Sequence, residues 1–317
     1  MILNNDQIKS ITFGALHIEE ADGKMRFFRF TPEMLEAWSE FDNVFTSRTR
    51  ATAGIRLDFH TNSKHMALNI EAPAKFEVYI NGLLRYTMEE VDTLSVDIDT
   101  PRGQPLDDAH VTIYFPSHKH GCFSSLELDD GAYVKPHSFD RKILFLGDSI
   151  TQGWDTVFDS LSFANKVSRY FNAESLIQGV GGACFFPQFL EPISFEPDWV
   201  VVAYGTNDFD RYRDDEPMIE KHMNEYLEKL SGMYGDKKIF VVSPIWRRLS
   251  KPEARERFER LRKTVEAQVK TFGFTLIDGS LLVPPINALY TDGLHPNDAG
   301  FSLYAENLIA QLEAFAQ

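Results

Sequence analysis

The first part of the chain, up to about residue 138, alternates apolar and polar residues in short runs that are rich in β-branched and aromatic side chains. A period of two is typical of half-buried β-strands. Turn signals such as Asn81-Gly82 separate the runs, as an antiparallel sandwich requires. We therefore predict an all-β, jelly-roll-like sandwich with strands at residues 55–60, 66–70, 76–80 and 111–115. No long helix is expected there, although residues 31–35 fit the start of a short one.

The rest of the chain follows a different pattern, in which short runs that are apolar on both faces alternate with amphipathic helical stretches. This alternation indicates an α/β fold with a parallel sheet and helices on both of its faces. The predicted strands are residues 142–146, 199–203, 238–242 and 274–277, and the predicted helices are residues 160–171, 217–233, 252–271 and 298–315. We predict two domains, a β-sandwich at residues 1–138 and an α/β domain at residues 139–317.

Composition narrows the class of partner. The chain has 317 residues, of which 43% are hydrophobic, and 47 acidic against 32 basic residues give a formal net charge of -15. This charge disfavours nucleic acid and anionic membranes, and no apolar stretch approaches the roughly 20 residues of a membrane span. Two cysteines, Cys122 and Cys184, are too few for a disulfide framework, and the first residues lack signal-peptide features. We expect a cytoplasmic protein that binds a small molecule or an oligosaccharide.

The segment Ile-Leu-Phe-Leu-Gly-Asp-Ser-Ile-Thr at residues 143–151 carries the first chemical signal. It predicts a buried strand that ends on a Gly-Asp pair and then presents the hydroxyl of Ser149. A serine at the carboxyl end of a core strand is a candidate nucleophile, although an isolated one could equally cap a helix. Such a serine needs a base, an orienting acid and donors for an oxyanion.

Three further polar blocks follow predicted strands or form glycine loops. They are Gly-Val-Gly-Gly-Ala at residues 179–183, Gly-Thr-Asn-Asp at residues 205–208 and Asp-Gly-Leu-His-Pro at residues 292–296. Each alone could be a turn, and a lone histidine is more often structural than catalytic. Four blocks that fall in this order past strand ends are hard to explain by turns alone, because open α/β sheets build their sites at that edge.

Taken together, the four blocks resemble those of the SGNH or GDSL hydrolase family. The resemblance implies a three-layer, flavodoxin-like sheet and a serine esterase that works through an acyl-enzyme without a metal or other cofactor. It assigns Ser149 as nucleophile, His295 as base and Asp292 as the acid that orients the base. The oxyanion donors would be the backbone amides of Ser149 and Gly182 and the side chain of Asn207. The second block departs from the usual family pattern, because Gly181 stands where a serine is frequent.

The domain order, a β-sandwich followed by a minimal SGNH domain, resembles the family-two carbohydrate esterases, which remove acetyl groups from polysaccharide sugars. The resemblance implies a carbohydrate acetylesterase. Flat aromatic faces suit sugar rings, so we take as candidate substrate contacts Trp154, Phe185, Phe186 and Trp246, although such residues commonly pack in cores.

Two alternatives stay open. One is a lysophospholipase or thioesterase with the same triad, and the other is a sugar-binding protein in which the sandwich does the work. A metal site at His118-Lys119-His120 is less favoured than a solvent-exposed turn, because no further ligands stand at a matched spacing.

Overall fold

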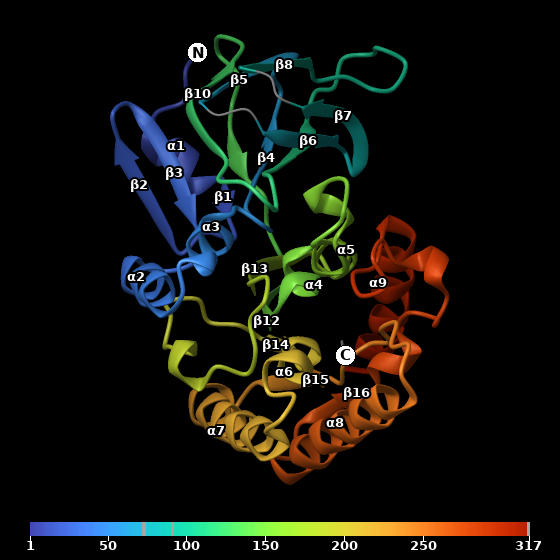
Figure 1. Cartoon of the computed structure of the whole chain (residues 1–317). Coiled ribbons are helices and arrows are strands. Elements are labelled where there is room, and N and C mark those ends of the chain that lie inside the picture. The colour runs from blue at the N-terminus through green and yellow to red at the C-terminus, as the bar shows by residue number, and fades with distance from the viewer. Residues whose placement is uncertain (72–73, 90–91, 316–317) are drawn as a thin grey trace.

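The chain folds into two halves that lie one above the other (Figure 1). The structure is a computed structural model that describes residues 1–71, 74–89 and 92–315. The antiparallel strands of the first half, called the sandwich half, end at Pro136. The second half, called the α/β half, contains a parallel sheet with helices, and its first strand begins at Arg141. The fold class predicted from the sequence is confirmed.

Two antiparallel sheets form the sandwich half. One has the strand order β1-β4-β9-β6-β7, with β11 also paired to β4, and the other has the order β2-β3-β10-β5-β8. Alternate residues of both sheets, such as Leu57 and Leu68, are fully buried in one shared core, so the sheets pack face to face. The first sheet comprises β1 (Thr12–Phe13), β4 (Arg56–Thr61), β6 (Lys75–Ile80), β7 (Leu83–Glu89), β9 (Ala109–Tyr114) and β11 (Lys135–Pro136). The second comprises β2 (His17–Ala21), β3 (Lys24–Phe28), β5 (His65–Ile70), β8 (Thr93–Asp97) and β10 (Cys122–Leu128).

The sandwich half also contains short helices, one of which begins where residues 31–35 indicate a helix start. Its helices are α1 (Asn5–Ser10), α2 (Pro32–Phe41) and α3 (Val44–Arg50). Thr31 caps α2, whose buried Trp38 stacks on Phe189 of the other half with ring centroids 3.9 Å apart. The apolar face of α2 therefore packs against the α/β half. The sequence around α2 does not indicate this contact, because its partner Phe189 lies far away along the chain.

The α/β half is built on a five-stranded parallel sheet with the order β13-β12-β14-β15-β16. Numbered within this half the order is 2-1-3-4-5, which is flavodoxin-like. The strands are β12 (Arg141–Gly147), β13 (Ala173–Gly179), β14 (Trp199–Ala203), β15 (Lys238–Val242) and β16 (Thr275–Ile277). Each of these strands except β13 is predicted from the sequence. The strand β13 is not predicted, because Glu174, Ser175 and Gln178 interrupt its apolar run.

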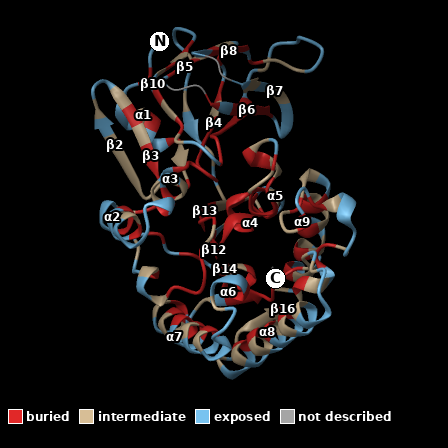
Figure 2. Cartoon of the chain, viewed as in Figure 1, coloured by how far each residue is buried: buried red, intermediate tan, exposed pale blue. Residues whose placement is uncertain are grey.

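Helices cover both faces of this sheet. Helices α5 (Phe163–Tyr170) and α9 (Asp298–Leu312) share a core with one face, and α7 (Glu216–Tyr234) and α8 (Pro252–Thr271) share a core with the other. Two short helices, α4 (Ser149–Gln152) and α6 (Thr206–Arg211), follow β12 and β14. The buried residues of the long helices face the sheet (Figure 2). Among the described residues, no helix is both long and apolar enough to cross a bilayer.

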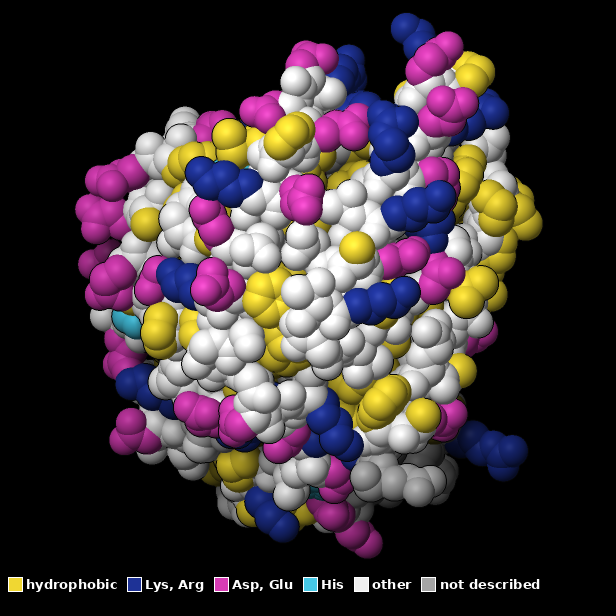
Figure 3. Space-filling model, turned by 90° about the horizontal axis from the view of Figure 1, so that it is seen from below, with side chains coloured by type: hydrophobic (Ala, Val, Ile, Leu, Met, Phe, Trp, Pro, Cys, Tyr) yellow, Lys and Arg dark blue, Asp and Glu magenta, His cyan; other side chains and the backbone are white. Residues whose placement is uncertain are grey.

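Acidic and basic side chains are interspersed on the face that carries α7 and α8 (Figure 3). No basic patch dominates this view, although it does show scattered apolar side chains between the charges. A mixed surface of this kind lacks the single-sign field that attracts a nucleic acid backbone.

A fully buried arginine joins the two halves. Arg29 donates hydrogen bonds to the carbonyls of Ala51 (2.8 Å) and Arg48 (2.8 Å) in its own half, and to those of Ile177 (2.8 Å) and Gly179 (2.7 Å) on β13. Burial lowers the pKa of Arg29 to about 9, against the opposing charge of Asp159, so the guanidinium still carries its charge at neutral pH. A guanidinium group is planar and carries five N–H donors, so it can bind four carbonyls at once, which an ammonium group with three donors cannot.

We expect Arg29→Met to lower the free energy of unfolding by at least about 3 kcal/mol, because four buried carbonyls lose their donor. Urea unfolding followed by circular dichroism measures the loss. The matched control is Arg102→Met on an exposed turn, which should change stability little. A loss of less than about 1 kcal/mol would contradict the role of Arg29.

Candidate active site

The carboxyl ends of three neighbouring strands bring the candidate residues together. Ser149 begins α4 directly after β12, the loop with Gly182 follows β13, and Asn207 lies in α6 after β14. The chain passes from β12 to β13 on one side of it, and from β13 back to β14 on its other side, so the strand order reverses at β12. Open α/β sheets form their binding crevice at such a switch in strand order.

Ser149, His295 and Asp292 form a hydrogen-bonded chain. The Oγ of Ser149 lies 2.9 Å from Nε2 of His295, and Nδ1 of His295 lies 2.9 Å from Oδ2 of Asp292. An ionised carboxylate only accepts, so we assign the ring proton to Nδ1 and the free lone pair of Nε2 to the serine hydroxyl. Ser149 is 5% exposed, and it is therefore sheltered from bulk water while its base reaches it.

The turn that holds His295 is built by Asp292 itself. Its Oδ1 accepts hydrogen bonds from the backbone amides of Leu294 and His295, both at 2.8 Å. Burial raises the pKa of Asp292, but the hydrogen bonds from the His295 amide and ring and from Leu294 outweigh it and hold the pKa below its ordinary value. The carboxylate therefore stays charged at neutral pH, which favours the imidazolium that forms when His295 takes a proton.

A second carboxylate, which sequence analysis missed, lies on the same side of the histidine. This carboxylate belongs to Asp155, which lies in the loop after α4 and adopts a positive φ of 70°. Its Oδ2 is 3.9 Å from Nδ1 of His295. Possible ligand atoms of Asp155, Asp292 and His295 lie within 4.8 Å of one another. Since Nδ1 of His295 already pairs with Asp292, we interpret these three residues as a site of proton transfer rather than a metal site. No motif spacing links Asp155 to Ser149, so only the fold reveals it.

The predicted oxyanion donors also converge. Nδ2 of Asn207 donates to the carbonyl of Ala183 at 3.0 Å, which places the amide beside the loop that contains Gly182. An amide nitrogen carries two hydrogens, so one is left for a ligand. Ser149 is the first residue of α4, and its backbone amide has no acceptor within that helix. Gly182 has a φ of 82°, a backbone conformation that favours glycine, and its Cβ position faces Nη1 of Arg48 at 2.6 Å.

The family model for GDSL-like lipases and acylhydrolases matches residues 145–303, which is half of the chain. The chain belongs to the GDSL-like lipase/acylhydrolase family. The match begins in β12 and ends in α9, so it spans each of the four sequence blocks. A comparison of the sequence with curated proteins finds no match.

Solved structures share the arrangement of both halves. SsfX3, a salicylyl-acyltransferase from a tetracycline biosynthetic pathway, aligns with a TM-score of 0.79 at 20% identity, over 96% of this chain and 94% of its own. A family-two carbohydrate esterase from Cellvibrio japonicus has a TM-score of 0.68 at 15% identity, over 98% and 96%. Another from Clostridium thermocellum, solved with cellohexaose, has a TM-score of 0.66 at 18% identity, over 84% and 93%. The resemblance to family-two carbohydrate esterases is confirmed at the level of the fold.

The sandwich half of this GDSL-family protein reaches the site, through residues that sequence analysis did not select. Arg48 of α3 donates from Nη1 to the carbonyl of Gly181 at 2.6 Å, and its guanidinium lies 5.5 Å from the Trp154 ring centroid. His118, between β9 and β10, meets the same ring edge-on with centroids 5.0 Å apart. Trp154 in turn lies 6.3 Å from the ring of His295. The candidate substrate contact Trp154 therefore belongs to the site.

The other aromatic candidates lie elsewhere. Phe185 is fully buried against Tyr204 and Tyr226, and Phe186 is 3% exposed and packs against Trp38. Neither ring offers a surface to a substrate, so we correct their expected role to core packing. Trp246 is half-buried against Tyr290, with ring centroids 4.9 Å apart.

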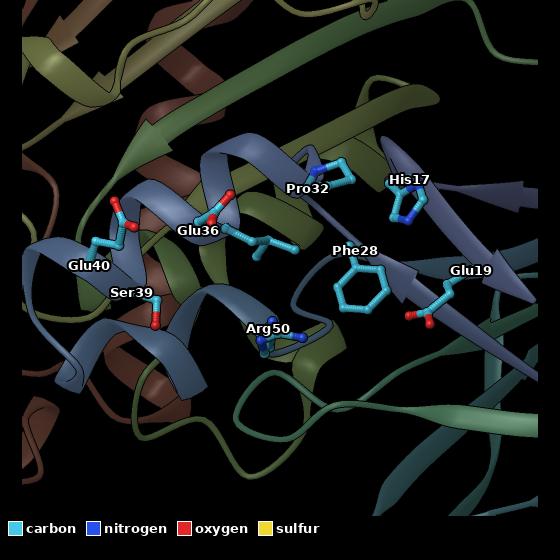
Figure 4. Close-up of a pocket in the computed structure, with 9 residues that line it drawn as sticks. His17, Glu19, Phe28, Pro32, Glu36, Ser39, Glu40 and Arg50 are labelled. Carbon is cyan, nitrogen blue, oxygen red and sulfur yellow. The ribbon is translucent and has the colours of Figure 1, made fainter. Parts of the chain in front are cut away.

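A hollow of about 430 Å³ lies away from these residues, between β2, β3, α2 and α3 (Figure 4). Phe28 forms its floor, flanked by Arg50 and by the acidic side chains of Glu19 and Glu36. None of the GDSL-block residues lines it. This hollow of the sandwich half is thus separate from the candidate active site.

Two buried carboxyl groups, those of Asp148 and Asp208, lie directly next to Ser149 and Asn207 in the sequence. Burial raises the pKa of Asp148 and of Asp208 to about 7 each, against hydrogen bonds from backbone amides. Asp148 caps α4 by accepting from Ile150 at 2.9 Å, and Asp208 accepts from the amide of Phe185 at 3.1 Å. Both carboxyls are therefore only partly ionised near neutral pH.

We expect Asp292→Asn to lower kcat/KM for an aryl ester by at least about 100-fold, because the amide donates where Nδ1 of His295 must donate and so favours the wrong tautomer. Asp155→Asn is the matched control. Its carboxylate is 1.0 Å farther from Nδ1 (3.9 against 2.9 Å), so its loss should stay below about 10-fold. Steady-state kinetics of both variants measures this, and the reverse order would assign Asp155 as the orienting acid.

We expect Asp208→Asn to remove part of the pH dependence of stability. The pKa of Asp208 is raised by burial from 3.8 to about 7, so its contribution to stability is present below pH 4 and is lost as pH rises through 7. Between pH 5 and 8 the native protein should lose about 2 to 3 kcal/mol relative to the variant. Urea unfolding at both pH values measures this, with Asp214→Asn at an exposed position as control. Parallel pH curves for the native protein and Asp208→Asn would contradict it.

Proposed function

We propose that this protein is a serine esterase that removes short acyl groups, acetyl above all, from a carbohydrate through an acyl-enzyme. The observation that carries the proposal is the unbroken chain from the Ser149 hydroxyl through His295 to Asp292, with both links at 2.9 Å. Membership of the GDSL-like family supports acyl hydrolysis. Substrate class and acyl-enzyme chemistry are the proposed part.

The first half-reaction forms the acyl-enzyme. Oγ of Ser149 attacks the ester carbonyl while Nε2 of His295 takes the hydroxyl proton, and the carbonyl electrons move onto oxygen. The amides of Ser149 and Gly182 and the side chain of Asn207 donate to this oxyanion, each worth about 3 to 4 kcal/mol in such sites. As the intermediate collapses, the bond to the sugar oxygen breaks, and His295 returns the proton to that leaving alcohol.

The second half-reaction releases the acid. Water takes the place of the departed alcohol, His295 removes its proton, and the resulting hydroxide attacks the acyl carbonyl. Collapse of the second tetrahedral intermediate breaks the bond to Oγ, which recovers the proton from His295. The products are a carboxylic acid and the deacylated alcohol, and the enzyme returns to its starting state.

A carbohydrate leaving group is favoured by the walls of the site. Trp154 offers an aromatic face beside His295, and Arg48 and His118 of the sandwich half surround this ring with polar groups. Sugars bind to such combinations, because their C–H faces stack on rings while their hydroxyls find hydrogen-bond partners. The family-two esterase solved with cellohexaose has the same two-part fold, which is consistent with an oligosaccharide substrate.

We expect release of acetate from acetylated mono- and oligosaccharides, with kcat/KM for acetyl esters at least about 10-fold above that for octanoyl esters. Ser149→Ala should lower kcat by about 10⁴-fold or more, whereas Ser124→Ala at an exposed position should retain activity. An acetate assay across a saccharide panel measures both.

Three results would contradict the proposal, each in its own way. Turnover retained in Ser149→Ala would remove the triad assignment. A preference for octanoyl esters would instead favour the lysophospholipase or thioesterase alternative. Saccharide binding by the native protein without any ester turnover would favour the sugar-binding alternative.

A further inference from the structure

Three histidines gather in the sandwich half, close to the junction with the α/β half. His60 on β4 and His110 on β9 are opposite each other in the antiparallel register. His137 directly follows β11, in which Pro136 pairs with Phe59 of β4. The register therefore brings three imidazoles from distant parts of the sequence into one stack, with ring centroids 4.1 to 5.3 Å apart.

The ring nitrogens of this group converge. Nε2 of His60 lies 3.0 Å from Nδ1 of His137, and one nitrogen from each of the three rings lies within 4.8 Å of the others. In a tetrahedral zinc site the ligand nitrogens are roughly 3.3 Å apart, as Zn–N distances of about 2.0 to 2.1 Å require. The spacing between His60 and His137 is already close to this value, and a nitrogen of His110 lies within 4.8 Å of both.

Each ring is also held from outside by an oxygen acceptor. Nε2 of His137 pairs with Oδ1 of Asn172 at 2.8 Å, and Nδ1 of His60 faces the carboxylate of Asp108 at 3.5 Å. Metal-binding histidines commonly hold the nitrogen away from the metal in this way, because the acceptor fixes the tautomer and the ring orientation. His60 and His137 therefore direct their other nitrogens toward each other.

We propose that His60, His110 and His137 bind a divalent transition-metal ion, with zinc as the ion of choice. Imidazole suits zinc and its neighbours in the first row, whereas magnesium and calcium prefer oxygen ligands. Three histidines leave a fourth position for water or another ligand. This site is separate from Ser149 and its partners, and it does not depend on the proposed esterase function.

The surroundings allow an ion to enter. A cavity of about 480 Å³ opens beside His110 and His137, and its walls also include Asn172. The side chains of His60 and His110 are 29% and 27% exposed, so solvent reaches the group.

The acceptor Asn172 follows α5 of the α/β half, and Figure 1 shows α5 lying against the sandwich half. Because His137 pairs with Asn172, an ion bound to His137 would link the strands of the sandwich half to the α/β half.

His110 carries an additional restraint. Its Nε2 pairs with Oδ1 of Asp58 at 2.5 Å, and Asp58 also accepts from Arg56 at 2.9 Å. A carboxylate that pairs with one nitrogen of a histidine fixes the orientation of the ring and favours binding of the other nitrogen to a metal cation.

The test uses the full chain after removal of metals with a chelator. Added Co²⁺ should give the intense visible absorption of a tetrahedral nitrogen-ligated ion at one equivalent, and titration calorimetry with Zn²⁺ should give the same stoichiometry. His137→Ala and His110→Ala should each abolish the absorption and weaken zinc binding by at least about 10-fold. Zinc should also raise the melting temperature of the native protein by several degrees.

Matched variants separate this site from others. His222→Ala, at a histidine on α7 that contacts Tyr212, should leave cobalt absorption unchanged, as should Asp292→Ala in the catalytic group. Loss of absorption in Asp292→Ala but not in His137→Ala would overturn the proposal, because the ion would then lie beside His295. Absence of absorption and of a melting shift in the native protein would overturn it without any variant, so misfolding of a histidine variant cannot decide the result.

Discussion

The buried guanidinium of Arg29 is the interaction on which the rest of the structure depends. It ties the segment around α3 to the end of β13 through four backbone carbonyls. The carbonyl of Gly179 is one of these, and the loop that follows it carries Gly182. A fully buried charge is tolerated only when its donors are satisfied, so neither half can move relative to the other here without exposing or stranding that charge.

This rigid junction makes the sandwich half a part of the site. Arg48, whose own carbonyl accepts from Arg29, donates to the Gly181 carbonyl and lies over Trp154. Gln152 of α4 donates to the carbonyl of Ser117 and accepts from the amide of Gly181, which links the nucleophile helix to both the glycine loop and the sandwich. The glycine loop is therefore held by residues from both halves, and such a rigid loop meets the condition for electrostatic preorganisation of the proposed oxyanion donors.

Burial acts differently on the acidic groups of the site. Asp148 and Asp208 lie under the helix starts, where burial raises their pKa to about 7. Asp292 is more open and accepts three hydrogen bonds, so its pKa is held low. The charged carboxylate is thus the one beside His295, while Asp148 caps α4 and Asp208 accepts from the amide of Phe185. The same residue type takes different roles because solvent access differs.

The sequence by itself determined the parallel sheet, apart from β13, and its long helices, because these depend on local periodicity. It also marked Ser149, His295, Asp292, Gly182 and Asn207 as candidate site residues, through short blocks at strand ends. Only the tertiary structure decided what lies between segments. Strand β13 is stabilised by pairing with β12 rather than by its own apolar pattern, and α2 packs on the other half.

The burial of Phe185, the approach of Asp155 and Arg48 to the site, and the gathering of His60, His110 and His137 were likewise decided by the tertiary structure alone. These features arise from strand register and packing between residues far apart in sequence. No local spacing encodes such contacts, and the physical reason is that their energy exists only once segments far apart in sequence are packed together.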